Sequence, residues 1–500
     1  DKYIQSIEAE LEELDYNDPK DKRKIVSREQ KISNIKAGIF TTKKEQELIR
    51  PINLGSSVDL PALMYSEEGF HFEVIKNNES GKPSTDEETL TNLRLTVKKP
   101  DSPKAIFLDR LLELRGLEKM YKTYIEGWNE KVQDDDRLHG RFLIHGTTSG
   151  RLSSAEPNAQ QIPKTSVDPN IKLQLKAPKG TLYIASDFSQ AELRIMAHLS
   201  GDETYLNAFN SGQDPHLAIA ATKYHIPYEE ALKIYEDENH PEHKIWKVRR
   251  KQAKQIAFGL IYGIGAKLLA VKLSDPKSGI IVTPEEAQKE MDIFFGQHPK
   301  LKTFLKKQEK FLRKNGHLVS LFGRKRRLPQ IYSNDKGEEA YALRLALNFP
   351  CQSAASDMCL FGSILIYYLM RQGKLPSTKS VCLVHDANYQ ITKPENINIW
   401  SIYEMWQIYR NPLTKPYFGF QIDDVTMDME FVIGRSMAEE LPFIPGYDYK
   451  KMLEPDFSVE EYMEEHKKYK HIPISEYKKR FNKQMKQYEK DFERTHGMES

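Results

Sequence analysis

The sequence predicts an α+β fold, in which helices pack with an antiparallel sheet. Two short apolar runs, residues 381–384 and 389–391, flank the turn residues 385–388, which is the pattern of a β-hairpin. Three longer stretches have the apolar spacing of helices: residues 105–128, 244–267 and 349–370. The last of these is expected to begin at Pro350.

Length and composition limit the class of protein. Five hundred residues suggest roughly three domains with ample core. The 74 basic and 72 acidic residues give a net charge of +2, so the global charge does not indicate nucleic acid. Three cysteines without a CxxC motif, and no apolar run of membrane-spanning length, predict a reduced, cytoplasmic protein with no membrane partner.

One stretch joins a strand to a helix and places an acid at the junction. Residues 182–185 have the length and apolarity of a strand, and the apolar spacing of residues 189–199 fits one side of a helix. Asp187 lies between them, where a carboxylate can face an open cleft and bind a divalent metal. Two simpler interpretations stay open: Asp187 is a helix-entry residue, and Ser189 with Glu192 forms a capping box.

The hairpin predicted at residues 381–391 projects a second acid, Asp386, from its turn. If its strands neighbour the strand before Asp187, the two carboxylates can share a pair of metal ions ~3.5–4 Å apart. An ordinary turn residue is the alternative.

A basic helical stretch, residues 244–267, carries two cations followed by two rings. Four of its residues recur every fourth position: Arg250, Lys254, Phe258 and Tyr262. They share one side of a helix that Gly263 and Gly265 end. Cations suit phosphates, and rings suit a base and sugar. The alternative is a basic surface helix with a buried apolar end.

Two other segments favour contacts with phosphates. Residues 137–163 are rich in small polar residues and carry Arg141 and Arg151, which can reach phosphates or base edges. Residues 300–327 are a basic run that ends in a compact Gly-Arg-Lys-Arg-Arg turn. An ordinary surface loop and a solvated charged face are the respective alternatives.

Taken in order, these segments are similar to the motifs of family A DNA polymerases, of the bacterial DNA polymerase I and phage replicative type. The similar stretches are TSGRLSSAEPNAQQIP at 148–163, DFSQAELRIMAHLSGD at 187–202, R-x3-K-x3-F-x3-YG at 250–263, GRKRRLP at 323–329, residues 348–357, and VHD at 384–386. The resemblance covers about residues 1–440, and the shared order of the motifs makes it specific.

The resemblance implies a right-hand fold with an antiparallel palm sheet, helical fingers and a helical thumb. The chain would divide into an entry helix and linker (1–59), thumb (60–135), first part of the palm (136–205), fingers (206–338), second part of the palm (339–446) and a charged C-terminal extension (447–500). No segment resembles a proofreading exonuclease. We expect the last part of the extension, residues 459–500, to be a solvated helical tail, with the docking of a replication partner as the alternative.

The resemblance also implies a reaction: attack of a primer 3′-hydroxyl on the α-phosphate of a dNTP, with two Mg²⁺ ions. Asp187, Asp386 and the Phe188 carbonyl would bind the ions, and Lys254 is the candidate proton donor. The implied dNTP contacts are Arg250, Lys254, Phe258, Tyr262, His216, Gln190 and Glu192. The implied DNA contacts are Arg151, Gln161, Gln352, Arg344, Arg324 and His385.

Several of these roles are more specific. Glu192 would occupy the position of a ribose 2′-hydroxyl and exclude rNTPs. Phe258, where some relatives have Tyr, would discriminate against dideoxynucleotides, and Tyr262 would stack at the template position. His216 would contact a phosphate, although Leu217 departs from the Thr often found after it.

One departure from the family matters: Ala387 stands where the family usually has Glu. The alternative function is therefore a catalytically weakened or inactive protein that binds primer-template DNA. A single-subunit RNA polymerase is disfavoured by Glu192. A zinc enzyme built on His240 and His243 lacks further ligands. We expect a monomer that acts in phage or bacterial replication or repair, in the bacterial host's cytoplasm if the gene is viral.

Overall fold

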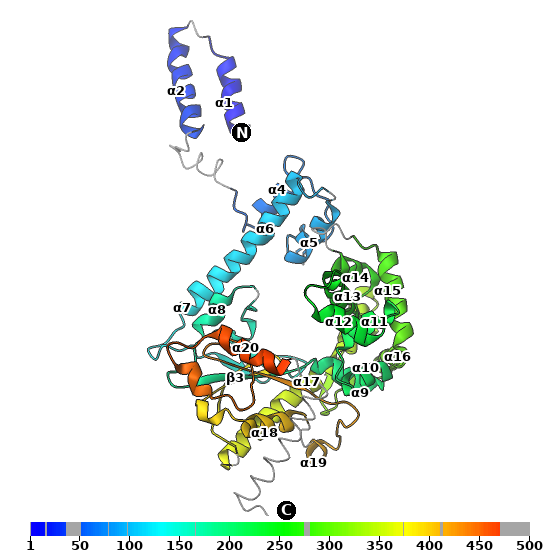
Figure 1. Cartoon of the computed structure of the whole chain (residues 1–500). Helices are drawn as coiled ribbons and strands as arrows, with labels where there is room; N and C mark the ends of the chain where they lie inside the picture. Colours follow the sequence, from blue (N-terminus) through cyan, green and yellow to red (C-terminus); the bar gives the residue numbers. More distant parts are fainter. Residues whose placement is uncertain are drawn as a thin grey trace, which may run out of the picture. The chain divides into compact units, whose positions relative to one another are not determined.

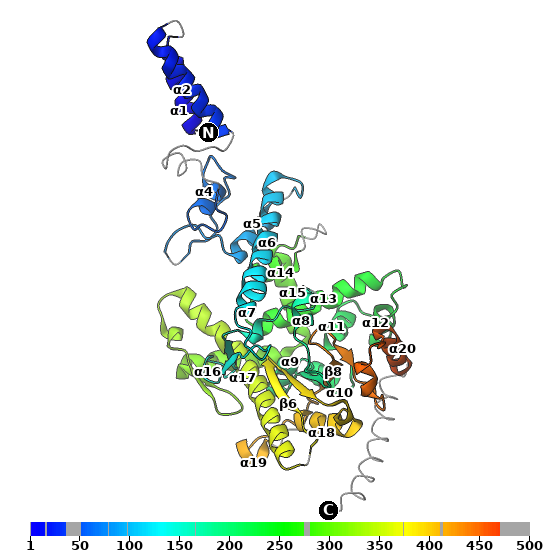
Figure 2. The same cartoon turned by 90° about the vertical axis from the view of Figure 1, so that its left-hand side faces the viewer.

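The computed structural model describes residues 2–15, 18–36, 52–78, 80–97, 99–165, 167–274, 281–373, 375–410 and 414–470. The chain divides into two compact units, residues 1–116 and 117–500, with the boundary inside helix α6 (Figures 1 and 2).

The first unit is helical. Its helices are α1 (Lys2–Glu12), α2 (Pro19–Lys36), α4 (Asp59–Tyr65), α5 (Glu87–Thr96) and the beginning of α6 (Pro103–Met120). Leu60 and Met64 of α4, Leu90 of α5 and Leu108 of α6 form its core. Helix α5 begins after Asp86, whose side chain accepts a hydrogen bond from the Thr89 amide at 2.7 Å, because an Asp at the N-cap satisfies a free amide of the first turn.

The second unit is built on a five-stranded sheet in the order β6-β7-β3-β8-β9, with every neighbouring pair antiparallel. The strands are β3 (Leu182–Phe188), β6 (Lys379–Val384), β7 (Ala387–Thr392), β8 (Met429–Gly434) and β9 (Leu441–Pro442). Two small sheets pair β1 (Arg141–Leu143) with β2 (Ser153–Ala155), and β4 (His317–Val319) with β5 (Lys325–Arg327). The α+β prediction is confirmed.

Most helices of the second unit share one hydrophobic core with this sheet, and two smaller clusters join η4 with α16 and α17, and η1 with α7 and α8. The helices before β1 are η1 (Tyr121–Glu126) and α7 (Gly127–Asn129). Those between β2 and β4 are η2 (Ala159–Gln161), α8 (Pro169–Gln174), α9 (Ala191–Ser200), α10 (Glu203–Asn210), α11 (Pro215–Lys223), α12 (Tyr228–Glu236), α13 (His243–Ile261), α14 (Ala266–Leu273), α15 (Pro284–Gln297) and α16 (Pro299–Asn315). Those after β5 are η4 (Pro329–Tyr332), α17 (Lys336–Arg371), η5 (Pro394–Asn396), α18 (Ile399–Arg410), α19 (Lys415–Phe418), η6 (Tyr449–Leu453) and α20 (Val459–Lys470). In Figure 1, α10–α16 gather on one side of the sheet region and α18 lies below β3.

Helix α17 differs from the expectation that a helix begins at Pro350. It begins at Lys336, so Pro350 lies inside it. Proline removes one helical hydrogen bond, but the turns around it are buried with Phe349 and Ala354 in the core, and packing outweighs the local penalty. Among the described helices, α17 alone is long and apolar enough to span a membrane by length and composition, and much of it is buried in the protein.

The hairpin turn is also shorter than expected. Only His385 and Asp386 lie between β6 and β7, because Ala387 and Asn388 already pair as the first residues of β7. His385 has a φ of 54°, and this left-handed backbone is what a two-residue hairpin turn requires.

The predicted solvated helical tail, residues 459–500, begins with a helix, α20, but one side of this helix packs against the protein. Tyr462 of α20 is 1% exposed, and its hydroxyl donates to the Pro442 carbonyl of β9 at 2.7 Å. Its ring packs edge-on against Tyr447, at 4.8 Å between centroids. Residues 471–500 lie outside the described residues, so the prediction for the rest of the extension stays untested.

Candidate active site

The two acids that the sequence places far apart meet where β3, the middle strand of the sheet, comes to its end. We call this end of the sheet, with Asp187, Asp386 and Glu430, the acidic edge. Asp187 pairs with Ala387 of β7 on one side and with Glu430 of β8 on the other. Asp386 lies in the turn directly before Ala387, and its carbonyl accepts a hydrogen bond from the Phe188 amide at 3.4 Å. The antiparallel register therefore fixes both acids beside each other.

This edge concentrates negative charge. The Asp187 side chain reaches solvent, but the surrounding protein removes part of its hydration, and the charges of Asp386 and Glu430 lie nearby. These effects, in that order, raise the pKa of the Asp187 carboxyl to about 6. A bound cation would relieve this repulsion.

The chemistry of the edge fits Mg²⁺ bound jointly with a substrate. Within the described parts of the chain, no three His, Cys, Asp or Glu side chains gather into a protein-only metal cage. Mg²⁺ rarely uses such a cage: it is usually held by one or two carboxylates together with water and substrate phosphates. Asp187 and Asp386 supply that pair.

A buried polar network lies beneath the hairpin that carries Asp386. The Asn388 side chain donates to the Tyr409 hydroxyl at 3.1 Å and to Ser363 Oγ at 3.2 Å, and it accepts from Ser380 Oγ at 2.6 Å. Tyr409 also packs edge-on against Phe188, at 5.6 Å between ring centroids. The network therefore ties β6 and β7 to helices α17 and α18.

Tyr409 comes this close only because residue 362 of α17 is glycine. A Cβ atom at Gly362 would lie 2.5 Å from the Tyr409 ring. Sequence reasoning missed the network, since an Asn beside a predicted turn is ordinarily a turn residue.

A chain of contacts leads from Asp386 to the end of helix α13. One Arg151 nitrogen, Nη2, lies 2.6 Å from Glu192 Oε1 and 3.5 Å from Asp386 Oδ1. The other Glu192 oxygen accepts a hydrogen bond from the Tyr262 hydroxyl, at the end of α13. Burial and then the Glu192 charge raise the pKa of Tyr262, so its hydroxyl stays a donor.

These contacts correct the capping-box expectation. The residue before α9 is Gln190, with a left-handed φ of 58° and no side-chain cap. Glu192 cannot reach back to cap the helix because both of its oxygens bind elsewhere. The Gln190 side-chain oxygen is buried, with no hydrogen-bond partner among the described residues.

Helix α13 presents its cations and rings as predicted, but one cation already has a partner. Arg250 binds the Asp214 carboxylate through Nη2 at 2.6 Å and Nε at 3.2 Å. Lys254 is exposed, and its Nζ lies 5.8 Å from the centre of the Phe258 ring. The Phe258 and Tyr262 rings are nearly parallel, at 6.1 Å. Sequence reasoning did not assign Asp214 a role, although its place before Pro215 is typical of an N-cap.

His216 lies buried behind this helix face. It is 1% exposed, and neither ring nitrogen has a hydrogen-bond partner among the described residues. The pKa of His216 is lowered to about 4: burial is the main cause, the Asp214 charge opposes it, and the charges of Arg250 and Lys254 add to the lowering. The ring is therefore neutral at pH 7 and can donate one N–H.

The predicted DNA contacts are spread over several elements of the second unit. Arg324 binds the Asp357 carboxylate of α17 at 2.8 Å. Its guanidinium group occupies the space that a Cβ atom at Gly150 would need. Arg344 is exposed and Gln352 half-buried on α17. Gln161 and His385 are exposed at the end of η2 and at the hairpin turn. The structure thus leaves most of these side chains accessible.

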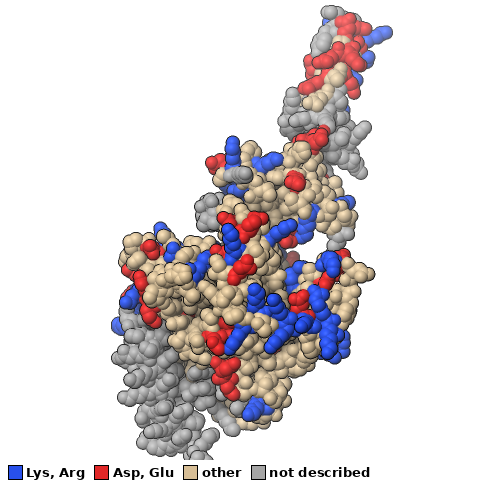
Figure 3. All heavy atoms as spheres, turned by 90° about the vertical axis from the view of Figure 1, so that its right-hand side faces the viewer, with Lys and Arg blue, Asp and Glu red and all other residues tan. Residues whose placement is uncertain are grey.

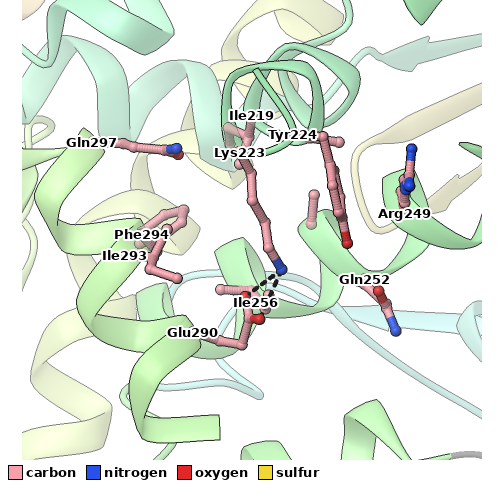
Figure 4. A pocket seen from close by; sticks show the side chains of 12 residues that line it. Ile219, Lys223, Tyr224, Arg249, Gln252, Ile256, Glu290, Ile293, Phe294 and Gln297 are labelled. Atoms are coloured by element: carbon pink, nitrogen blue, oxygen red, sulfur yellow. Dashed lines mark hydrogen bonds and ion pairs between the residues drawn. The ribbon is translucent and has the colours of Figure 1, made fainter. Parts of the chain in front are cut away.

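A cavity lies on another side of α13, between α11 and α15 (Figure 4). It is a small recess partly open to solvent, in which Lys223 binds Glu290 at 2.7 Å beside apolar side chains such as Ile256 and Phe294. Helix α13 lines it with Arg249, Gln252, Ala253 and Ile256. The predicted site residues take no part in this cavity.

Comparisons with known proteins agree with this geometry. The profile of DNA polymerase family A matches residues 22–398. The thermostable DNA polymerase I of Thermus aquaticus is 32% identical over 319 residues, which cover 63% of this chain and 35% of the relative. The DNA polymerase I of Caldicellulosiruptor bescii is 32% identical over 336 residues, which cover 67% of this chain and 36% of the relative. The chain therefore spans about a third of the length of these curated relatives.

A solved structure shows the same fold. The POL domain of Pol1 from M. smegmatis, in complex with DNA primer-template and dNTP, matches with a TM-score of 0.63 and 26% identity. The match covers 87% of this chain and 66% of the other. Since the family profile matches well over half of the chain and the fold agrees with it, this chain belongs to DNA polymerase family A.

Proposed function

We propose that this chain is a template-directed DNA polymerase that adds dNTPs to a primer 3′-hydroxyl with two Mg²⁺ ions. One observation carries the proposal: contacts run without a break from Asp386 through Arg151 and Glu192 to Tyr262 on α13. An acidic edge suited to metal and a helix of cations and rings thus border the same site. A nucleotide needs both, the first at its α-phosphate and the second along its triphosphate.

The acidic edge would hold the metal ions. Asp187, Asp386 and the Phe188 carbonyl supply the hard oxygen ligands that Mg²⁺ prefers. Bound there, Mg²⁺ supplies Lewis-acid activation of the 3′-hydroxyl and stabilises the charge on the leaving pyrophosphate.

The cations of α13 would bind the triphosphate. Arg250 must exchange or share its Asp214 partner to do so, whereas Lys254 is free of any ion pair with the described residues. Lys254 is also the candidate proton donor to pyrophosphate. His216, neutral and without another partner among the described residues, would donate a hydrogen bond rather than a charge.

Sugar selection would rest on Glu192. Arg151 and Tyr262 hold its carboxylate from both sides, so it cannot easily swing aside for a 2′-hydroxyl. Phe258 would contact the sugar near its 3′ position and so discriminate against dideoxynucleotides. Tyr262 would stack at the template position. Arg151, Gln352 and Gln161 would donate to the minor groove, where every Watson–Crick pair offers acceptors.

The test is extension of a labelled primer by the parent chain, Asp187→Ala and Asp386→Ala. We expect the parent to extend with dNTPs but not with rNTPs, and each variant to lose about 10³-fold in rate, several kcal/mol of barrier. Asp423→Ala removes an exposed acid outside the site and should not change the rate. A parent chain that binds DNA without extending it would overturn the proposal.

A second candidate, a weakened or inactive DNA-binding protein, is favoured by Ala387. Ala387 pairs with Asp187 across the strands and is 8% exposed. Its methyl side chain offers no carboxylate beside the two Asp residues. We expect Ala387→Glu to lower the Mg²⁺ concentration needed for extension a few-fold, with Ala387→Gln as the uncharged control. An unchanged rate and Mg²⁺ dependence would show that the site is not weakened.

A further inference from the structure

A stripe of lysines runs along the exposed side of α16. Its four members recur every fourth position: Lys302, Lys306, Lys310 and Lys314. All four are exposed, and the helical rise places them roughly 6 Å apart along a line of about 18 Å. Figure 3, which faces the side of the molecule where α16 lies in Figure 1, shows Lys and Arg side chains gathered on this surface.

The charges of the lysine stripe are not compensated. Glu309 is the only acid in α16, and it binds Arg313 at 3.0 Å. Two nearby acids are also engaged: Glu203 binds Lys300, and Glu339 binds Arg313. None of the four lysines has an ion-pair partner in the described parts of the chain. This local excess stands in a chain whose net charge is only +2.

Such a stripe weakens the helix that carries it. Like charges four positions apart each destabilise a helix by about 0.2–0.5 kcal/mol. The helix dipole favours a cation in the last turn, which accounts for Lys314 but not for Lys302 or Lys306. An anionic partner would relieve the repulsion among the four lysines, and this gain would favour its binding.

The form of the stripe identifies the partner. The apolar side chains Leu301, Phe304, Leu305 and Leu312 are buried in the protein. Phe311, 44% exposed, is the one large apolar side chain of α16 that reaches solvent, so the exposed side lacks the broad apolar face that a membrane-surface helix presents outward. Successive cations of the stripe lie about 6 Å apart along the helix axis and turn about 40° around it, and such an evenly spaced, gently winding row fits a polymer with evenly spaced anions. The chain then continues through Gly316 into the β4–β5 hairpin, where Lys325 and Arg327 are exposed.

We propose that the lysine stripe of α16 binds the sugar–phosphate backbone of DNA beyond the reacting base pair, an inference that rests on the proposed function. The bound strand is either the duplex behind the primer end or the single-stranded template ahead of it. Both offer the same phosphate chemistry. The stripe raises affinity without reading sequence, because it contacts no base edges.

The test compares the parent with the variant K302Q/K306Q/K310Q/K314Q. Binding is measured as a function of salt on two primer-templates, one with a long duplex and short overhang, the other with a short duplex and long overhang. Each lost phosphate contact lowers the slope of log Kd against log salt by roughly 0.7–0.9, so we expect a loss of about 3 on the DNA that reaches the stripe. The matched control is K450Q/K451Q/K467Q/K468Q, four exposed lysines at the C-terminal end of the described chain.

A loss of slope on either DNA supports the proposal and shows which strand is bound. An unchanged slope on both, or an equal loss in the control variant, overturns it. Folding is checked by thermal unfolding, which should show an unchanged or higher Tm because the like-charge repulsion is gone. Extension of a minimal primer-template, too short to reach the stripe, should be unchanged. Failure of the parent in that assay would instead count against the proposed function.

Discussion

The acidic edge of the sheet and the cationic face of α13 hold their charges in different ways. At the sheet edge, strand register places Asp187, Asp386 and Glu430 together without a full counter-charge. On α13, Arg250 is already bound to Asp214, whereas Lys254 has no acidic partner among the described residues. Like charges therefore repel each other at the acidic edge. On α13, the Arg250–Asp214 ion pair must be broken or shared before Arg250 can bind another group.

This difference predicts how each region responds to its ligand. Backbone pairing and buried side chains support the sheet edge, so it is pre-organised and needs only a cation. The α13 face is arranged by helical spacing alone, and its side chains are long and exposed. Binding there has to order Lys254 and release part of the Arg250–Asp214 pair. The first region therefore fixes geometry, and the second sets affinity.

Of the changes that separate these two regions, Lys254→Ala is expected to have the largest effect. A charge-assisted hydrogen bond to a phosphate contributes about 1.5–3 kcal/mol, so kcat/KM for dNTPs should fall roughly 10–100-fold. Lys251→Ala is the matched control, because Lys251 is an exposed cation of the same helix outside the four-residue spacing. Single-nucleotide extension kinetics measure both. Equal losses in the two variants would show that only the overall charge of α13 matters.

The next effect probes the support of the acidic edge. Asn388→Leu keeps the size of the side chain but removes its hydrogen bonds to Ser363, Ser380 and Tyr409. We expect the free energy of unfolding to fall by about 2 kcal/mol, because a buried side chain loses three hydrogen bonds, although Ser363 and Tyr409 can still bind each other and the exposed Ser380 can bind water. The extension rate should fall up to about tenfold, while KM for dNTPs stays the same.

Tyr409→Phe is the milder companion to that variant. It removes one hydroxyl from the network and should cost about 1 kcal/mol of stability. Urea unfolding and extension kinetics measure both variants. If the rate of Asn388→Leu were unchanged despite the lost stability, the network would hold the fold without positioning Asp386.

The sequence anticipated elements that are set by local chemistry. The spacing of Arg250, Lys254, Phe258 and Tyr262 on α13 follows from helical periodicity, and the hairpin follows from two apolar runs around polar residues. The meeting of Asp187 and Asp386 required knowledge of strand order, which apolar patterning does not contain. There the family resemblance supplied what the residues alone left open.

Partners chosen by tertiary packing could not be predicted. Glu192 fits a capping box by spacing, yet it binds Arg151 and Tyr262, which lie far from it in the sequence. Pro350 fits the first turn of a helix, but α17 continues through it because the residues around it are buried in the core. In both cases a local pattern was outweighed by contacts that no sequence window shows.

The smallest effect concerns pH and the charge stored at the acidic edge. The pKa of Asp187 is raised to about 6, against about 3.9 for an unfolded Asp, so the folded protein binds an extra proton between these values. The stability this proton contributes is complete below pH 4 and is lost as the pH rises through 6. Asp187→Asn removes the repulsion, so without metal it should raise the free energy of unfolding at pH 8 and change it little at pH 4. Because the side chain reaches solvent, screening limits the gain to about 1 kcal/mol or less. Urea unfolding in EDTA at the two pH values measures it, and an equal gain at both would show that Asp187 does not carry the stored charge.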